Sequence, residues 1–250
     1  MKKIPRIVAI LLLLSTTSTL ALAACDDPPQ KGVIWIDCDK QGIDLRGLDL
    51  RGAILIRTNL TGADLRDTKL SGADFNFADL NDARLENARL DKARFVSANM
   101  ANAKLNNSYL NGATLDRALL DKAQFKNARM QGVSLYQSSL ISANLSGADL
   151  QGAKLVQATL TGADLSAANL SGANFEQAVL EDAVMKDCNL QKANLENANL
   201  QFADLSNADL SMAILVNALL SETNLTGTRL DKAQWIDRKR CRPGSIGQCD

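Results

Sequence analysis

Large apolar residues recur at every fifth position along most of the chain, from Leu45 to Trp235. These 39 consecutive positions hold only Leu, Phe, Met and one final Trp, and a small residue, usually Ala, stands two residues before nearly all of them. A period of five fits neither the 3.6-residue period of a helix nor the two-residue period of a strand. The pattern therefore predicts a chain that turns once in every five residues, with one large and one small residue pointing inward.

The glycines indicate where the turns fall. Of the 15 glycines, 13 lie in the phase two residues after the large apolar position, and seven asparagines share that phase. Gly and Asn tolerate the positive φ that the third position of a type II turn requires. Each pentapeptide is therefore predicted to be a short extended piece followed by a tight turn.

The repeated triplet resembles the consensus of the pentapeptide-repeat family, which is Ala, then Asp or Asn, then Leu, then two variable residues. Here it reads, for example, Ala63-Asp64-Leu65, Ala143-Asn144-Leu145 and Ala148-Asp149-Leu150. The resemblance implies an all-β fold, a right-handed quadrilateral β-helix with four pentapeptides in each coil. About ten coils at the usual inter-strand spacing would give a rod roughly 48 Å long. Coils of such a solenoid bury their apolar residues only by stacking, so both ends need caps.

The first residues do not follow the repeat and read as a signal peptide. Lys2, Lys3 and Arg6 precede an apolar run over 7–14, and small residues follow at 21, 23 and 24. We therefore divide the chain into a signal peptide at 1–23, an N-terminal linker at 24–32, a β-helix at 33–238 and a C-terminal disulfide cap at 239–250. The expected location is the periplasm or the exterior of a bacterium.

Cys25 leaves a second reading of the leader open. Leu22-Ala23-Ala24-Cys25 also matches a bacterial lipobox, in which Cys25 would become the lipidated first residue of a membrane-anchored lipoprotein. The protein is expected to have no contact with a membrane unless it is lipidated there.

The five cysteines lie mainly at the ends, where the segments resemble the caps of exported family members. Cys241 and Cys249 flank a Pro-Gly turn, and we expect them to form a disulfide, which export permits. Cys25 and Cys38 flank a Pro-Pro pair and are expected to pair in the same manner. Cys188 falls in the alanine phase and is expected to be a buried free thiol.

Two tryptophans are predicted to close the ends of the core. Trp35 and Trp235 are 200 residues apart, so a 20-residue coil places them on the same side at opposite ends of the rod. Lys40 interrupts the apolar phase between Trp35 and Leu45, and the first coil is expected to be irregular there.

Candidate chemistry is sparse. The chain has no histidine, which removes the commonest general base and metal ligand. We find no nucleophile motif, phosphate loop or metal-ligand spacing, and so predict no enzyme activity, no cofactor and no metal. Aspartates recur just before the large apolar residue, where turn support is the simpler explanation than acid–base catalysis; they are Asp44, Asp49, Asp64, Asp74, Asp149, Asp164, Asp204 and Asp209.

Charge adds little to this picture. The chain carries 28 basic and 28 acidic residues, and loss of a leader with three positive charges leaves a net charge of −3. There is no basic excess to hold nucleic acid.

One outward row is richer in apolar residues than the others. The residues directly after Leu55, Phe95, Leu135, Leu155 and Leu215 are apolar. They form the candidate interaction face, and Phe77 adds to it if it points outward; the members are Ile56, Val96, Tyr136, Val156 and Val216. Two readings stay open: β-branched residues that suit a flat ladder, or a stripe that binds a partner.

The predicted function is that of an exported, non-enzymatic scaffold that presents rigid faces to an unknown protein partner, as a monomer or an end-to-end dimer. A remote alternative comes from the side through Leu60, Leu80 and Leu220, which has an acidic excess. Some members of the family that the sequence resembles bind DNA gyrase as acidic mimics of DNA, but an exported protein would not meet gyrase.

Overall fold

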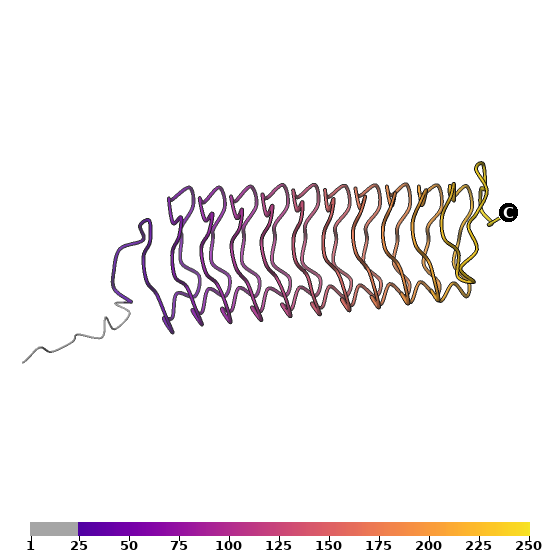
Figure 1. Cartoon of the computed structure of the whole chain (residues 1–250). Coiled ribbons are helices and arrows are strands. Elements are labelled where there is room, and N and C mark those ends of the chain that lie inside the picture. The colour runs from indigo at the N-terminus through magenta and orange to yellow at the C-terminus, as the bar shows by residue number, and fades with distance from the viewer. Residues whose placement is uncertain (1–24) are drawn as a thin grey trace, which may run out of the picture.

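The computed structural model describes residues 25–250, which form one long coil drawn out into a rod (Figure 1). Parallel bridges join residues 20 positions apart, from Ile34 with Ile54 to Ile214 with Gln234. Every bridge is a single residue long, and the described residues contain no helix and no longer strand. The colour in Figure 1 runs steadily from one end to the other, so each coil contacts only the coils before and after it. The predicted signal peptide, residues 1–23, lies outside the described residues.

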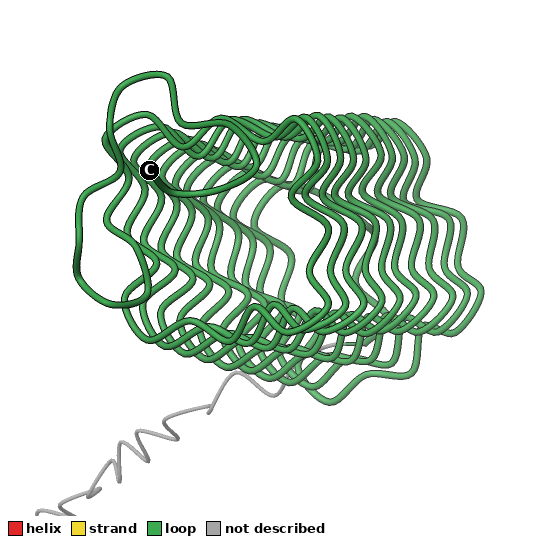
Figure 2. Ribbon diagram, turned by 90° about the vertical axis from the view of Figure 1, so that its right-hand side faces the viewer, coloured by secondary structure: helices red, strands yellow, loops and turns green. Residues whose placement is uncertain are grey.

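A coil of 20 residues with a turn every five residues has four sides. We name each side after its first buried leucine: the Leu45, Leu50, Leu55 and Leu60 faces. The residue before each large buried residue forms the bridge and lies in the middle of a face, and the two residues after it form the corner to the next face. Figure 2, turned by 90° from Figure 1, shows successive coils lying side over side in register.

The turn phase predicted from the glycines is confirmed. Every fifth residue from Gly32 to Lys232 has a φ between 54° and 72°. The next backbone N–H donates to the carbonyl three residues earlier, as Leu48 N does to Leu45 O at 3.2 Å. Residues without the freedom of glycine also adopt this conformation, among them Phe77 and Met212. Because an L-residue costs roughly 1–2 kcal/mol there, stacking of the coils must hold these turns in place.

The interior consists of the large apolar and the alanine positions. Leu145 and Ala148, like nearly all their equivalents, have no or almost no exposed surface. Equivalent side chains stack from coil to coil, and the rings of Phe75 and Phe95 lie 4.7 Å apart and within 6° of parallel. Where a hydroxyl replaces an alanine, it donates to a backbone carbonyl, as Ser108 does to Leu105 O at 2.6 Å. The core is therefore continuous, and its few polar groups are hydrogen-bonded.

The N-terminal end is closed by Trp35, which is fully buried. Its indole N–H donates to Asp27 O at 3.2 Å, and a disulfide joins Cys25 to Cys38 with Cα atoms 5.5 Å apart. The expected irregularity at Lys40 is wrong. Lys40 N donates to Asn59 O at 2.8 Å in the regular pattern, and the ammonium lies 4.4 Å from the Trp35 ring centroid. A cation–π contact lets the lysine occupy the inward phase at the edge of the core.

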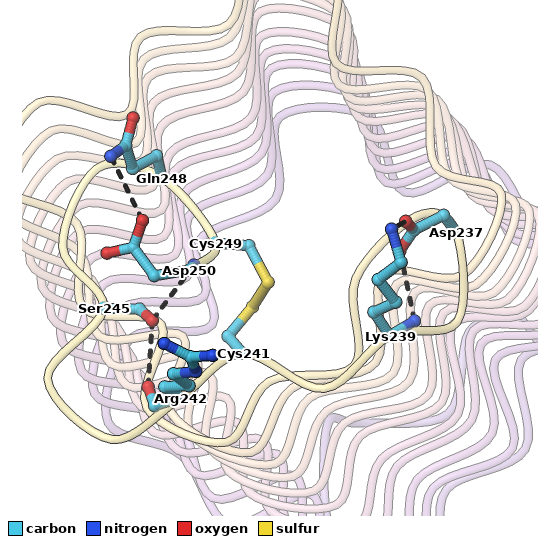
Figure 3. The surroundings of a disulfide bond; sticks show 8 residues. All are labelled: Asp237, Lys239, Cys241, Arg242, Ser245, Gln248, Cys249 and Asp250. Carbon is cyan, nitrogen blue, oxygen red and sulfur yellow. Dashed lines mark hydrogen bonds and ion pairs between the residues drawn. A yellow bond between two sulfur atoms is a disulfide. The ribbon is translucent and has the colours of Figure 1, made fainter.

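At the C-terminal end the chain folds back over the last coil (Figure 3). Antiparallel bridges join Gln234 to Arg240 and Arg229 to Ile246, and a disulfide joins Cys241 to Cys249. This cover is less complete than the one over Trp35. Large residues of the repeat that keep some exposure all lie near this end; they are Leu220, Leu225 and Trp235.

Among the described residues, no helix is long and apolar enough to cross a membrane.

Candidate functional site

The apolar row predicted as an interaction face follows the corner between the Leu55 and Leu60 faces. Its members differ in exposure, which decides what a partner could reach. Tyr136 is 39% exposed, whereas Val216 is 5% exposed. Ile56, Val96 and Val156 are half-buried. Tyr136 is therefore the member of this row that offers most of its surface to solvent.

The row is also interrupted, because polar residues occupy the same corner in the intervening coils. Asn76 accepts a hydrogen bond from Val96 N at 2.9 Å, and Asp116 accepts one from Tyr136 N at 3.2 Å. These side chains cap the backbone of the next coil. As a result, the apolar row is divided into short pieces. In one of these pieces, Tyr136 and Val156 lie in successive coils.

A hollow of about 450 Å³ lies beside this pair, across the Leu55 face. Tyr136 and Val156 form one wall, and Gly152 and Gly172 stand at the opposite corner of the face. Since neither glycine carries a side chain, the surface dips there. The whole lining consists of Ser134, Tyr136, Gly152, Ala153, Lys154, Val156, Gly172 and Asn174.

A ladder of glutamines holds the corner beside the hollow. Gln137 donates through Nε2 to Gln157 Oε1 at 2.8 Å, and Gln157 donates in the same way to Gln177 at 2.7 Å. Gln137 and Gln157 directly follow Tyr136 and Val156, whereas Gln177 follows Glu176. The ladder therefore fixes the backbone that carries Tyr136 and Val156, and the site is formed in advance.

The chemistry of the hollow suits binding. It combines an aromatic and an aliphatic wall with an ammonium from Lys154 and short polar groups from Ser134 and Asn174. In residues 25–250, no group of three His, Cys, Asp or Glu residues is placed to hold a metal ion.

The recurring aspartates support turns, in agreement with the simpler explanation of their spacing. Each of the eight accepts a hydrogen bond from the backbone N–H two residues later, as Asp164 does from Ser166 N at 2.9 Å. Arg46 and Arg51 also donate to Asp44 and Asp49, and these hydrogen bonds lower the pKa of both carboxyl groups to about 2. Such groups stay ionised and make poor general acids.

Cys188 is a buried free thiol. Its Sγ donates to Leu165 O at 2.8 Å, and burial raises the pKa of the thiol to about 12. A thiol that does not ionise is a poor nucleophile, so Cys188 acts as a core residue.

Several exposed apolar residues fall outside the predicted row. Phe77 does point outward and is 58% exposed, but Leu119, Phe202 and Leu219 are also 51–53% exposed. The phase rule could have identified all three, because none of them occupies an inward position. Leu119 and Leu219 lie in the middle of the Leu60 face, so this face combines its acidic residues with bare leucines.

Comparison with known proteins agrees with the repeat. A family model described as pentapeptide repeats matches eight copies, over residues 41–72, 68–107, 98–137, 143–182, 163–201 and 203–234. No curated protein gives a significant match to the sequence.

The solved structure of HetL shows the same architecture. HetL, a pentapeptide repeat protein involved in heterocyst differentiation regulation in the cyanobacterium Nostoc, is 32% identical, with a TM-score of 0.71 over 80% of this chain and 92% of that one. A pentapeptide repeat protein of the Arabidopsis thaliana thylakoid lumen is 30% identical over 39% of this chain and 64% of its own, with a TM-score of 0.30. The plasmid-mediated fluoroquinolone resistance protein QnrB1 is 21% identical over 79% of this chain and 89% of its own, with a TM-score of 0.33.

Proposed function

Because the chain belongs to the pentapeptide repeat family, we propose that it is an exported, non-enzymatic scaffold that binds a protein partner on the outside of its rigid coil. The proposal includes the right-handed coil of about ten turns that the family resemblance implies. Solenoids of this kind offer long, fixed surfaces to partners.

The hollow beside Tyr136 and Val156 is the observation that carries this proposal. It is a depression with an apolar wall, and the glutamine ladder lies along the corner that carries this wall. Little conformational entropy opposes binding to a preformed site. Tyrosine is also enriched among residues that dominate interfaces. We therefore place the centre of the contact at Tyr136.

The composition of the hollow indicates the kind of group that it accepts. An apolar side chain of the partner would lie against Tyr136 and Val156, and removal of that surface from water contributes about 25 cal/mol per Å². The ammonium of Lys154 would meet a carboxylate or carbonyl oxygen at the edge. An exposed protein segment with an apolar residue next to an acidic one fits both features.

Paired serine variants test this assignment. Tyr136→Ser with Val156→Ser removes the wall of the hollow, whereas Ile56→Ser with Val96→Ser changes the same corner position away from it. Both proteins should keep the circular dichroism spectrum of the wild type. We expect only the first to lose the proteins that the wild type captures from envelope extract. If the first variant captured these proteins as well as the second, the apolar row would serve only to pack neighbouring coils of the β-helix.

Export and the state of Cys25 form a separate part of the proposal. Lipidation and the Cys25–Cys38 disulfide are mutually exclusive, because both use the same sulfur atom. We favour cleavage before residue 24 and a soluble protein in the periplasm or outside the cell. Intact-mass measurement of the mature protein distinguishes this form from a lipoprotein, which would begin at Cys25 and carry the mass of a diacylglycerol.

The remote alternative, an acidic mimic of DNA that binds gyrase, predicts inhibition of DNA supercoiling by the purified protein. The exposed Leu119 and Leu219 interrupt the acidic side on which it depends. We expect no inhibition.

A further inference from the structure

Along the outward row of the Leu50 face, most of the charges in the N-terminal half are repeated in reverse order, with opposite sign, in the C-terminal half. Bridges place its ten residues one per coil along the rod. Read in sequence, the row is Asp49, Lys69, Arg89, Tyr109, Arg129, Asp149, Asn169, Asn189, Asp209 and Arg229. Its midpoint falls between Arg129 and Asp149. Residues at equal distances on the two sides of this midpoint can be compared in pairs. Wherever both members of a pair are charged, their charges are opposite.

We propose that two copies of the chain associate side by side and antiparallel through their Leu50 faces. The two-fold axis would lie between the coils of Arg129 and Asp149, across the long axis of the rod. Such an interface is isologous, so every contact away from the axis occurs twice. The arrangement goes beyond the proposed binding of a protein partner and differs from an end-to-end dimer.

Three kinds of oppositely charged pair would form along the central row of the interface, and each would occur twice. Arg129 of one copy meets Asp149 of the other, Lys69 meets Asp209, and Asp49 meets Arg229. No two like charges meet in this row. Arg89 and Tyr109 face the amides of Asn189 and Asn169, which can accept or donate hydrogen bonds.

The corners on either side of the face agree with the same axis. An axis across the rod sets each corner against the same corner of the second copy. Glu86 then meets Lys186, and Arg51 meets Asp231. The outer turn positions give one pair of like charges, Lys92 with Lys192, at the rim, where solvent screens it.

The glycines at one edge of the Leu50 face share this midpoint. Gly112 and Gly132 lie before it and Gly152 and Gly172 after it, in four successive coils. The axis sets Gly132 against Gly152 and Gly112 against Gly172. Since none has a side chain, the two rods can approach closely along this edge.

The two registers that lie half a coil from this one place like charges together. A shift of the axis by half a coil toward the N-terminus sets Arg129 against itself and Asp49 against Asp209. The opposite shift sets Asp149 against itself and Lys69 against Arg229. A parallel dimer would set every residue of the row against its own copy. The charges therefore favour the proposed antiparallel register, which forms more pairs of opposite charge than the registers next to it.

Three cations of this face are available for such contacts. Lys69, Arg89 and Arg129 are exposed, and within residues 25–250 none of them forms an ion pair. Arg129 lies with its guanidinium 4.9 Å from the Tyr109 ring centroid. These cations lack an intrachain carboxylate partner on the very face where aspartates recur further along the rod.

At the outer ends of the interface the charges are already paired within each chain. Arg51 is 2.6 Å from Asp49, and Arg229 is 3.3 Å from Asp231. The dimer would bring these two pairs together into a square of alternating charges.

The size of the face sets the expected strength. A rod about 48 Å long with sides about 10 Å wide offers on the order of 500 Å² per copy, which is near the lower limit for specific interfaces. The interface is also mostly polar. We therefore expect a weak dimer that forms at high protein concentration and dissociates as salt screens the ion pairs.

Charge exchange between two variants tests the pairing. In Arg129→Glu the central contacts become carboxylate against carboxylate, and in Asp149→Arg they become guanidinium against guanidinium. Each variant alone should associate at least about tenfold more weakly than the wild type in sedimentation experiments at low salt, a loss of about 1.4 kcal/mol. An equal mixture should associate again, because both central contacts of the mixed dimer join opposite charges. Recovery in the mixture would also show that each variant is folded.

A pair of introduced cysteines tests the register itself. Tyr109→Cys with Asn169→Cys places the two thiols opposite each other between copies, but three coils, or roughly 14 Å, apart within one chain, which is beyond disulfide reach. Mild oxidation should give a covalent dimer. Tyr109→Cys with Asn189→Cys, one coil out of register, should not. The proposal is wrong if the wild type stays monomeric at millimolar concentration and low salt, if the mixture fails to associate, or if both cysteine pairs cross-link equally.

Discussion

The row of buried leucines and the corner row that follows it lie one residue apart in the chain but vary in different ways along the rod. Leu135 and Leu155 have large apolar equivalents in the neighbouring coils, and both are fully buried. The residues after them, Tyr136 and Val156, have polar counterparts at the same corner, such as Asp116 and Glu176. A requirement shared by all coils acts on the inner row, namely dense stacking without water. The outer row does not have to meet this packing requirement. Its residues can therefore differ from coil to coil and form a specific binding site.

The largest effect on stability is expected from a substitution in the inner row of buried leucines. Leu145→Asp places a carboxylate between stacked leucines, which costs several kcal/mol and should unfold the protein or interrupt the rod. Ser146→Asp changes the next residue, on the corner, and should be nearly neutral. Thermal unfolding compares them directly. Equal melting temperatures would show that the inward phase has been assigned wrongly.

The next largest effect on stability is expected at the C-terminal end of the core. Cys241→Ser with Cys249→Ser removes the disulfide that holds the C-terminal cover over the last coil. We expect a loss of about 2–3 kcal/mol in the free energy of unfolding, as is usual for short loops. Cys188→Ala is the control, since alanine is the usual residue of its phase, and should change stability by less than about 1 kcal/mol. Denaturant titration of both variants would contradict this account if the control were the less stable protein.

A substitution at a turn position tests how much backbone strain at a corner affects stability. Gly152 has a φ of +65° and no neighbouring atom within 4 Å of an added Cβ. Gly152→Ala should therefore destabilise the protein by roughly 1 kcal/mol through backbone strain alone. Lys192→Gly, two coils later at the same corner, relieves the corresponding strain and should cost nothing or stabilise slightly. The prediction fails if the alanine variant melts at or above the wild-type temperature.

The smallest effect concerns charged groups of the outer row. Hydrogen bonds from Arg51 lower the pKa of Asp49 to about 2, below that of the unfolded chain near 3.9. The stability from this pair is present above pH 4 and is lost as the pH falls toward 2. Asp49→Asn should reduce that part of the acid sensitivity. Because both groups are exposed, we expect a difference of only a degree or two in the acid shift of the melting temperature. Identical shifts in the two proteins would mean that the pair contributes nothing.

The features that could be predicted from the sequence are those set within one pentapeptide. The spacing of Leu45 and its equivalents is local, and so is the glycine phase, which is why the core and the turns follow from the sequence. Lys40 shows the limit of this reasoning, because its place in the first coil depends on a contact with Trp35, five residues earlier but across the end of the core.

Features formed between coils were harder to predict. The hollow exists because Gly152 and Gly172 leave one corner bare opposite Tyr136. Periodicity alone treats these residues as separate turns. Val216 occupies the phase of Tyr136 but is buried near the folded-back end of the chain. Phase therefore identifies which residues point outward, while exposure and the neighbouring coil decide which of them a partner can reach.

The separation of stability from recognition is tested most directly by measuring both quantities on two neighbouring changes. Leu135→Asp alters the inner row, and Tyr136→Ser with Val156→Ser alters the wall of the hollow. For each protein, the melting temperature and the capture of envelope proteins would be recorded together. The account predicts that the inner change abolishes both, and that the outer change removes capture while the melting temperature stays within a few degrees of the wild type. If the outer variant melted as early as the inner one, or captured the same proteins as the wild type, the central claim would be contradicted.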